Sequence, residues 1–479
     1  MQNDIKIVKM SIKDKVYIDI RENRELYNTL SVLGISPNPL FYLRKKIASL
    51  ANEPQYLFSV MSNPEQTFLA FYRGLLPRII ETLQERNIPF EILDYRVKGE
   101  SINIFIKPSV NLFDYQSRAL EKLSKLENAI LVSECGSGKT VMGVALISTF
   151  KVSTLIIVPT LQIQQQWKTS LIKMTDIKRK DIGMIGQGIS NLSKITISTY
   201  QSLERMEPKQ LEELNAKFGC LIVDEAHRVS ARILCEVANK SPAFYRFGFT
   251  ATPQRKDQKD ILIFNSISHN IIDVKSEELQ KAGRLIIPSV RFVKINTGIQ
   301  ITECYRWNGA EKVVEKDWTT LFTRLTESTT RTNIILDNIE KTVLENHICL
   351  VLTNRKAYCE YLSRKLNERG ISSNYINGHI AKSDREAILK NMGSKIKVLF
   401  STYQLASEGL DVPILSCLHL ISPTSNENLV KQASGRVRRA IEGKKALIID
   451  YVDEDSKELF NMYKLRRRYY KKFGFVIEN

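Results

Sequence analysis

Between residues 110 and 290 the apolar positions fall into short, nearly uninterrupted runs. Segments with the apolar spacing of helices separate these runs. Strands that are apolar throughout, with helices between them, are typical of a parallel sheet covered on both faces. The runs are NAILVSE (128–134), TLIIVPT (154–160), KITISTY (194–200), GCLIVDE (219–225) and YRFGFTA (245–251).

A second series of the same kind lies further along the chain. Its runs are HICLVLT (347–353), IKVLFST (396–402), LSCLHLI (415–421) and KALIIDY (445–451). The simplest account is two α/β lobes in tandem. We predict the first lobe over residues 109–290 and the second, with a basic C-terminal helix, over 331–479. Residues 291–330 lack a clear sheet pattern and are predicted as a linker or insertion.

The first 108 residues have a different pattern. KVYIDI (15–20) and QTFLAFY (66–72) mix β-branched and aromatic residues as strands do. LLPRIIETLQERNI (75–88) has helical apolar spacing and runs into PFEILDYRV, a predicted strand. The sequence therefore predicts a small N-terminal α+β accessory domain over residues 1–108.

Composition narrows the class of protein. The chain has 479 residues, of which 43% are hydrophobic and 25% charged, as in ordinary globular proteins. No apolar run reaches the roughly 18 residues of a membrane span, and the N-terminus lacks the apolar stretch of a secretory signal. The seven cysteines include no CxxC pair, so we expect no zinc site and a reducing compartment. An intracellular, cytoplasmic protein is expected, in the host cytoplasm if the source is a phage or virus.

The net charge of +18 attracts polyanions, of which nucleic acid is the natural one. A surface of scattered, solvated lysines is the alternative, and charge alone does not decide between them.

The first candidate for chemistry is SECGSGKT, Ser133 to Thr140, directly after the run NAILV. It matches the phosphate-loop pattern except that Ser133 stands in the place of the first glycine. Glycines let backbone N–H groups close around phosphate oxygens, and the next helix directs its positive end to the same anion. The predicted nucleotide-binding residues are Gly136, Ser137, Gly138, Lys139 and Thr140. Lys139 would reach the β and γ phosphates, and Thr140 would bind Mg²⁺.

The second candidate is the acidic pair Asp224–Glu225, which ends the run GCLIVDE. Ligands of open α/β sheets bind at the carboxyl ends of the strands. Asp224 would hold Mg²⁺, and Glu225 would orient the attacking water. A loop or helix cap is the structural alternative. The sequence thus predicts ATP and Mg²⁺ as cofactors and ATP hydrolysis as the reaction.

These motifs, with their neighbours, resemble superfamily 2 helicases. GSGKT, DEAH (224–227) and TATP (250–253) occur in the order of that family, followed by LVLTNR (350–355), STYQLASEGLDVP (401–413) and QASGRVRR (432–439). The resemblance covers residues 110 to about 450. It is nearest to the group of xeroderma pigmentosum B-like enzymes and viral or phage branch-migration helicases of the UvsW type. It implies two RecA-like lobes that hydrolyse ATP and move along nucleic acid.

The resemblance also implies roles for single residues. Gln116 would read adenine, and Gly409 and Asp411 would approach the nucleotide from the second lobe. Arg436 and Arg439 would act as arginine fingers. A coupling role falls on His227, Thr250, Thr252 and Gln432. Nucleic-acid contacts fall on Pro159, Thr160, Thr199, Tyr200, Asn354, Arg355, Thr402 and Gln404.

The basic C-terminal tract contains Lys464, Arg466, Arg467, Arg468, Lys471 and Lys472, interleaved with Tyr469 and Tyr470. This composition suits contact with a nucleic-acid backbone combined with base stacking. A basic amphipathic helix packed on the second lobe is the alternative.

The expected activity is that of an ATP-dependent DNA helicase or translocase, acting as a monomer on forked, branched or duplex DNA. Residues 1–108 would bind DNA and select the substrate. An RNA helicase, a transcription-associated factor that releases transcripts, and a restriction-enzyme motor subunit are the alternatives.

Overall fold

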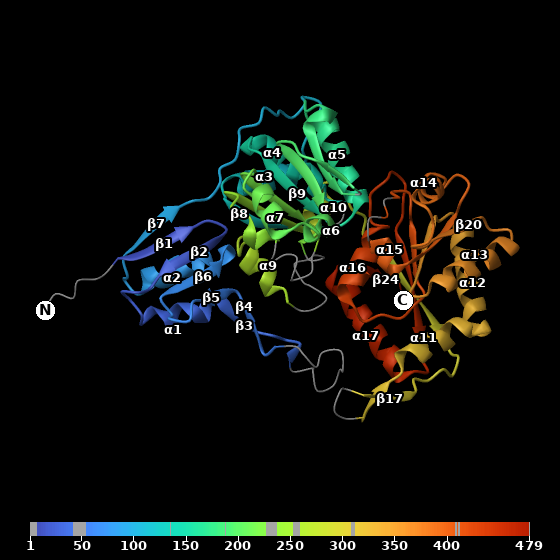
Figure 1. Cartoon of the computed structure of the whole chain (residues 1–479). Helices are drawn as coiled ribbons and strands as arrows, with labels where there is room; N and C mark the ends of the chain where they lie inside the picture. Colours follow the sequence, from blue (N-terminus) through green and yellow to red (C-terminus); the bar gives the residue numbers. More distant parts are fainter. Residues whose placement is uncertain are drawn as a thin grey trace. The chain divides into compact units, whose positions relative to one another are not determined.

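The computed structural model describes residues 7–41, 54–134, 136–186, 188–226, 237–251, 259–307, 312–407, 410 and 412–478. The chain divides into two compact units, Met1–Glu278 and Leu279–Asn479. The first unit holds an N-terminal module and a large parallel sheet, and the second holds another parallel sheet (Figure 1). Within the described residues, no helix has the length and apolar character needed to cross a membrane.

The N-terminal module is a five-stranded mixed sheet with helices packed on one face. Its strand order is β5-β6-β2-β1-β7. Ile79 and Leu83 of helix α2 pack with Met10 and Ile18 in one buried cluster. The strands are β1 (Val8–Ile12), β2 (Lys15–Asp19), β5 (Val60–Ser62), β6 (Phe68–Tyr72) and β7 (Phe90–Asp94), beside the pair β3 (Ile35–Pro37) and β4 (Tyr56–Phe58). The helices are α1 (Leu26–Ser31), η1 (Val32–Gly34), η4 (Arg73–Leu75) and α2 (Leu76–Glu85).

The sheet of the first lobe has the order β11-β10-β12-β9-β13-β14-β8-β15. All of its neighbouring strands are parallel except β11 on β10. The strands are β8 (Asn128–Ser133), β9 (Thr154–Val158), β10 (Ile182–Gly186), β11 (Ile189–Asn191), β12 (Ile195–Thr199), β13 (Cys220–Asp224), β14 (Tyr245–Thr250) and β15 (Ile271–Val274). The helices are α3 (Asp114–Ser124), α4 (Lys139–Phe150), α5 (Leu161–Met174), η5 (Arg179–Asp181), α6 (Tyr200–Glu204), α7 (Pro208–Asn215), η7 (Ala238–Lys240), α9 (Ile261–Ser266) and α10 (Ser276–Lys281).

The sheet of the second lobe is parallel throughout, in the order β20-β21-β19-β22-β23-β16-β24. Alternate residues of β19 enter two different buried clusters, Leu350 one and Val351 the other, because helices cover both faces. The strands are β16 (Ser289–Ile295), β19 (Cys349–Thr353), β20 (Ser373–Ile376), β21 (Val398–Thr402), β22 (Cys417–Leu420), β23 (Leu447–Asp453) and β24 (Val476–Ile477), with the separate hairpin β17 (Glu303–Trp307) and β18 (Lys312–Lys316). The helices are α11 (Trp318–Glu327), α12 (Thr329–Leu344), α13 (Lys356–Glu368), α14 (Lys382–Lys390), α15 (Tyr403–Ser407), α16 (Glu427–Gly435) and α17 (Lys457–Lys472).

Each apolar run that predicted a strand in the two lobes is a strand of the structure, so the α/β class with two RecA-like parallel-sheet lobes is confirmed. The stretch 291–330, predicted as a linker or insertion, carries regular structure instead. Most of β16 lies within it and joins the second sheet, and α11 follows the hairpin.

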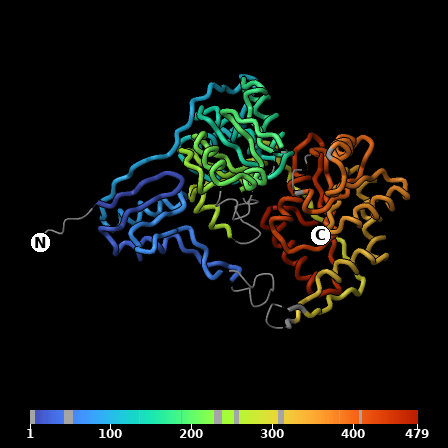
Figure 2. The backbone as a smooth tube through the Cα atoms, in the orientation of Figure 1, coloured from blue at the N-terminus to red at the C-terminus, as the bar shows by residue number. Residues whose placement is uncertain are grey.

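The N-terminal module and the first lobe are joined by a buried contact. The guanidinium of Arg73, in η4, donates to the carbonyl oxygens of Ala243 (2.5 Å) and Phe244 (2.9 Å). Arg246 of β14 donates to the carbonyl of Asp14, in the N-terminal module, at 3.3 Å. The chain after β7 then runs along the first lobe as an extended segment (Figure 2), with isolated bridges at Val97, Ser101 and Ile106.

Candidate nucleotide-binding site

The phosphate loop connects the end of β8 to the start of α4. Gly136 and Gly138 have positive φ angles of 87° and 82°, which glycine adopts without strain. A Cβ atom at Gly138 would lie 2.4 Å from Nε2 of Gln116. Both the backbone conformation and the space therefore require glycine at 138, as the motif predicted.

Lys139 lies at the first position of α4 and points back over the loop. Its Nζ donates to the carbonyl oxygen of Ser133 at 3.1 Å. The same Nζ lies 3.8 Å from Oε1 of Glu225, at the end of β13. The strand β14 separates β8 from β13 in the sheet, so the fold brings the predicted lysine and the predicted acidic pair together across it.

Asp224 is buried, with 5% of its surface exposed. Its Oδ2 accepts a hydrogen bond from Nε1 of Trp167 at 2.7 Å, and its Oδ1 accepts one from the backbone N–H of Glu225 at 2.9 Å. The hydroxyl of Tyr200 donates to its carbonyl oxygen. Burial, with the negative charge of Glu225, raises the pKa of Asp224 to about 6. A neighbouring cation would lower that pKa and stabilise the carboxylate.

Glu225 has a φ of +48°, an uncommon backbone conformation for a residue other than glycine. The chain turns sharply there, directly after the strand. Such outliers gather at functional sites, where the surrounding structure holds them in place. The turn sets the carboxylate of Glu225 beside Lys139.

Gln116 and Tyr115, at the start of α3, hold the phosphate loop in place by hydrogen bonds. Nε2 of Gln116 and the hydroxyl of Tyr115 both donate to the carbonyl of Ser137, at 3.0 and 2.8 Å. Oε1 of Gln116 accepts from the backbone N–H of Phe113 at 3.1 Å. Both ends of this amide thus have a partner within the protein, and each end retains a second donor or acceptor position for contact with adenine.

The structure places the remaining predicted nucleotide and coupling residues as follows. Thr140 lies in the first turn of α4. Thr250 is buried at the end of β14, paired with Val132 of the phosphate-loop strand. Predicted residues that lie outside the described part of the chain are His227, Thr252, Gly409 and Asp411.

The predicted nucleic-acid residues of the first lobe have mixed surroundings. The hydroxyl of Thr160 caps α5 by accepting from the N–H of Ile163 at 3.3 Å. The hydroxyls of Thr199 and Ser202 lie 2.8 Å apart. Pro159 and Tyr200 are buried, and the hydroxyl of Tyr200 donates to the backbone carbonyl of Asp224.

In the second lobe the predicted residues follow the ends of β19 and β21 and the helix α16. Asn354 and Gln404 are exposed, and Arg355 donates to the carbonyl of Thr319 at 3.0 Å. The hydroxyl of Thr402 accepts from the N–H of Leu405 at 3.4 Å. Gln432 lies on α16, Arg436 caps that helix and donates to the carbonyl of Leu410, and Arg439 follows in the next turn.

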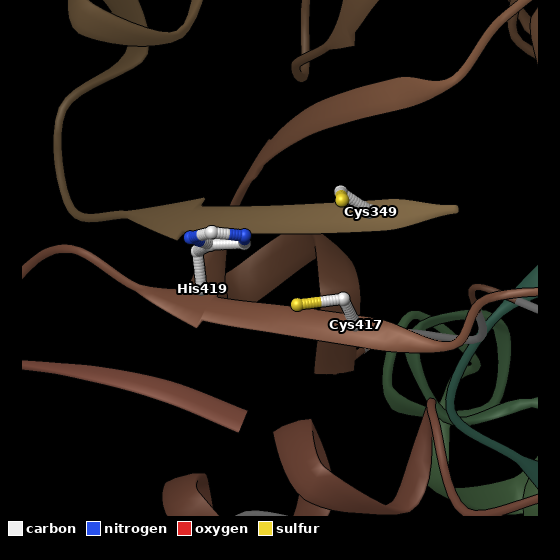
Figure 3. Close-up of side chains that lie close together, drawn as sticks. All are labelled: Cys349, Cys417 and His419. Carbon is white, nitrogen blue, oxygen red and sulfur yellow. The ribbon is translucent and has the colours of Figure 1, made fainter. Parts of the chain in front are cut away.

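One cluster of potential metal ligands was not predicted. Cys349 on β19 and Cys417 and His419 on β22 share one face of the second sheet (Figure 3). The sequence could not predict this cluster from residue spacing, because its members come from two neighbouring strands rather than from one short motif. The ring nitrogens of His419 lie 3.0 Å from the hydroxyls of Thr342 and Tyr451. The cluster therefore forms a closed hydrogen-bonded network in the core, and we assign no metal to it.

The first-lobe site fits a magnesium–nucleotide complex by its donors. Lys139 and the N-terminus of α4 provide positive charge for phosphates. Asp224 and the hydroxyl of Thr140 are oxygen ligands of the kind that Mg²⁺ takes. Chains with this arrangement bind nucleoside triphosphates.

Two family models match the chain. Residues 109–255 match the family described as "Type III restriction enzyme, res subunit", and residues 331–441 match "Helicase conserved C-terminal domain".

Two curated proteins illustrate the similarity. The DNA 3'-5' translocase XPB2 of Sulfurisphaera tokodaii is 35% identical over 207 residues, 43% of this chain and 45% of that protein. The DNA 3'-5' helicase XPB of Mycobacterium tuberculosis is 25% identical over 413 residues, 84% of this chain and 72% of that protein. The chain thus spans less than half the length of the archaeal relative.

A crystal structure of T4 UvsW superposes with a TM-score of 0.43 and 16% identity, covering 99% of both chains. Together with the phosphate loop and the acidic pair in one sheet, the two family models and the two relatives show that the chain belongs to the superfamily 2 helicases, a family of ATP-dependent enzymes.

Proposed function

We propose that this protein is an ATP-dependent DNA helicase or translocase that couples ATP hydrolysis to unwinding or branch migration of forked, branched or duplex DNA. The observation that carries the proposal is the 3.8 Å approach of Lys139 to Glu225. It joins the phosphate loop to the acidic pair in one site, as phosphoryl transfer requires.

Each residue of this site has a proposed role. When bound, Mg²⁺ neutralises the charge of the ATP phosphates, and Thr140 and Asp224 would hold it. Lys139 would bind the β and γ phosphates, and Glu225 would orient the attacking water. Arg436 and Arg439 of the second lobe would stabilise the transferring phosphoryl group, for which a planar guanidinium is suited. Hydrolysis would then require the lobes to close, which couples it to motion.

Three observations support DNA as the substrate. The net charge is +18, which favours a polyanion. Two similar proteins are named as a DNA translocase and a DNA helicase. The N-terminus of α5, capped by Thr160, and the exposed side chains of Asn354 and Gln404 offer polar groups that can bind phosphates without reading the base sequence. We propose that residues 1–108 add the preference for branched or duplex DNA.

Stimulated ATPase measurements test the proposal. Turnover should be compared with single-stranded DNA, linear duplex, a fork, a four-way junction and RNA, at equal nucleotide concentration. We expect stimulation by DNA, strongest with branched or duplex forms. Stimulation by RNA alone would instead establish the RNA helicase alternative and refute the proposal.

Lys139→Ala should reduce ATP turnover by about 100-fold or more, because the phosphates lose their main cation. Binding of duplex DNA, measured by fluorescence anisotropy without nucleotide, should stay within about twofold of the wild type, because the lysine lies on the nucleotide side of the sheet. Turnover that survives the substitution would mean that the ATP site lies elsewhere.

A further inference from the structure

Helix α17, which the sequence presented as one basic tract, has two chemically different faces. Its inner face carries Arg466 and Tyr470, both buried. Arg466 donates to both carboxylate oxygens of Asp450 of β23, and the hydroxyl of Tyr470 donates to Oδ2 at 2.7 Å. The attraction of Asp450 raises the pKa of Arg466 above its ordinary value despite burial. These two residues therefore serve the fold, as in the alternative of a basic amphipathic helix packed on the second lobe.

The outer face carries Lys464, Arg467, Arg468 and Lys471. Their spacing of i, i+3, i+4 and i+7 places the four side chains in one stripe on the helix surface. All four are exposed. Together with Lys294 of β16 they line a groove of about 380 Å³. We refer to this set of four as the α17 stripe.

The charges of the α17 stripe are not neutralised within the protein. Across the described residues, none of the four takes part in an ion pair. Other exposed lysines nearby do: Lys472 pairs with Glu427 and Lys316 with Glu458, both at 2.8 Å or less. Glu454, the acidic residue that lines the groove, pairs with Lys294 at 2.9 Å. The groove therefore presents a clear excess of positive charge.

The groove is also lined by two aromatic residues, Phe460 and Tyr463. The ring of Tyr463 packs edge-on against Phe292 with centroids 5.0 Å apart. The ammonium of Lys464 lies 4.8 Å from the centre of the Phe460 ring. Because both rings already have partners, recognition here depends on charge rather than on stacking with bases. A ligand that suits this surface is an extended row of anions.

We propose that the α17 stripe binds the phosphate backbone of the DNA substrate, as a contact separate from the residues that follow β19 and β21. Seven residues of helix span about 10 Å, which matches roughly three successive phosphates of one duplex strand. The inference rests on the proposed function, because it takes DNA as the polyanion. It adds an anchor on the second lobe that no helicase motif includes.

The test compares two double variants that lose the same charge. Arg467→Gln with Arg468→Gln removes two cations of the stripe. Arg364→Gln with Lys365→Gln removes two cations of α13, both of which pair with Glu368. Binding of a fluorescent 30-base-pair duplex is measured by anisotropy across a range of KCl concentrations, and urea unfolding verifies that each variant is folded.

We expect the stripe variant to bind the duplex about 10-fold more weakly at 0.1 M salt, with the slope of log Kd against log salt reduced by about 2. The α13 variant should stay within about twofold of the wild type. Equal affinities for the two variants would overturn the inference. So would a stripe variant that loses affinity for poly-glutamate but not for DNA, since the partner would then be an acidic polypeptide. Failure of the proposed function is distinct, because the wild type itself would neither bind DNA nor respond to it.

Discussion

At the scale of single residues, the candidate site contains a carboxylate, Asp224, whose ionised form is disfavoured by burial and by a neighbouring negative charge. Asp224 is buried beside Glu225, and its pKa is raised to about 6. Its two oxygens are met by Trp167 and by one backbone N–H. Removing a partner from a buried charge costs more than the bond itself contributes, because the charge stays desolvated. Trp167 is therefore a positioning residue for Asp224.

Trp167→Phe tests this role. The substitution keeps an aromatic ring next to Phe249 but removes the N–H donor. We expect the free energy of unfolding to fall by about 2 kcal/mol, as for a hydrogen bond to a charged group. ATP turnover should fall while KM for ATP changes little, because the carboxylate loses its orientation. Urea unfolding and steady-state kinetics measure both effects.

The matched control for Trp167→Phe is Trp318→Phe on α11. Trp318 is 36% exposed and lies in the second lobe. It should alter tryptophan fluorescence without changing turnover. If the two variants behave alike, Asp224 does not depend on Trp167.

The sequence predicted Lys139, Asp224 and Glu225 because each lies within a short motif beside a strand. It did not predict the partners of Asp224. Trp167 is 57 positions away along the chain and Tyr200 is 24 positions away. Both were visible in the sequence, but only the order of strands β9, β12 and β13 in the sheet brings them to the carboxylate. Local spacing contains no such information.

At the scale of elements, apolar runs identified most of the central strands but missed others, among them the fully buried β10 and the partly solvated β16. β9 and β13 are buried at every position and were predicted. β16 (SVRFVKI) has exposed or half-buried residues at most positions, including Arg291 and Lys294, and was assigned to a linker. A strand near a sheet edge keeps polar residues on its solvated face, so a search for continuous apolar runs passes over it.

Substitution of two adjacent arginines of α17 by alanine should change stability by very different amounts. Arg466→Ala leaves Asp450 buried without its cation and should lower the free energy of unfolding by about 3–5 kcal/mol. Arg467→Ala should change that free energy by less than about 0.5 kcal/mol, because the side chain is solvated. Urea unfolding of the two variants, followed by circular dichroism, makes the comparison. Similar losses at both positions would contradict the two-faced description of the helix.

At the scale of the whole molecule, the N-terminal module and the first lobe share a polar, buried junction. Besides Arg73, Nδ2 of Asn265 donates to Oγ of Ser59 at 2.9 Å. Oδ1 of Asn265 faces Nε2 of His269 at 2.9 Å. These hydrogen bonds are directional, and the buried groups have few other partners to bind. We therefore expect the module to keep its orientation on the first lobe while DNA is bound.

The junction predicts an acid-sensitive stability. Burial, with the nearby positive charge of Arg78, lowers the pKa of His269 below 6.5 in the folded state. Below pH 6.5 the unfolded chain then binds more protons at this residue than the folded chain, so stability is lost as the pH falls towards the folded pKa. His269→Gln should therefore reduce the loss of stability between pH 7.5 and pH 5.5, measured by urea unfolding. An identical loss in variant and wild type would show that other groups cause it.

Gly74→Ala tests the rigid attachment itself. Gly74 lies in η4 at the junction, and a Cβ there would lie 2.1 Å from the carbonyl oxygen of Phe264 and 2.6 Å from that of Asn265. Backbone atoms cannot move aside as a flexible side chain can, so η4 and α9 must separate. We expect faster hydrogen exchange in both segments and earlier proteolytic cleavage between β7 and α3. Gly378→Ala is the control, because a Cβ there would meet only Nζ of Lys356, at 3.9 Å.

If the module selects the substrate through its fixed position, Gly74→Ala should reduce the preference for branched over linear duplex DNA more than it reduces stimulation by single strands. Unchanged exchange in η4 and α9 would mean that the module is not held by this contact.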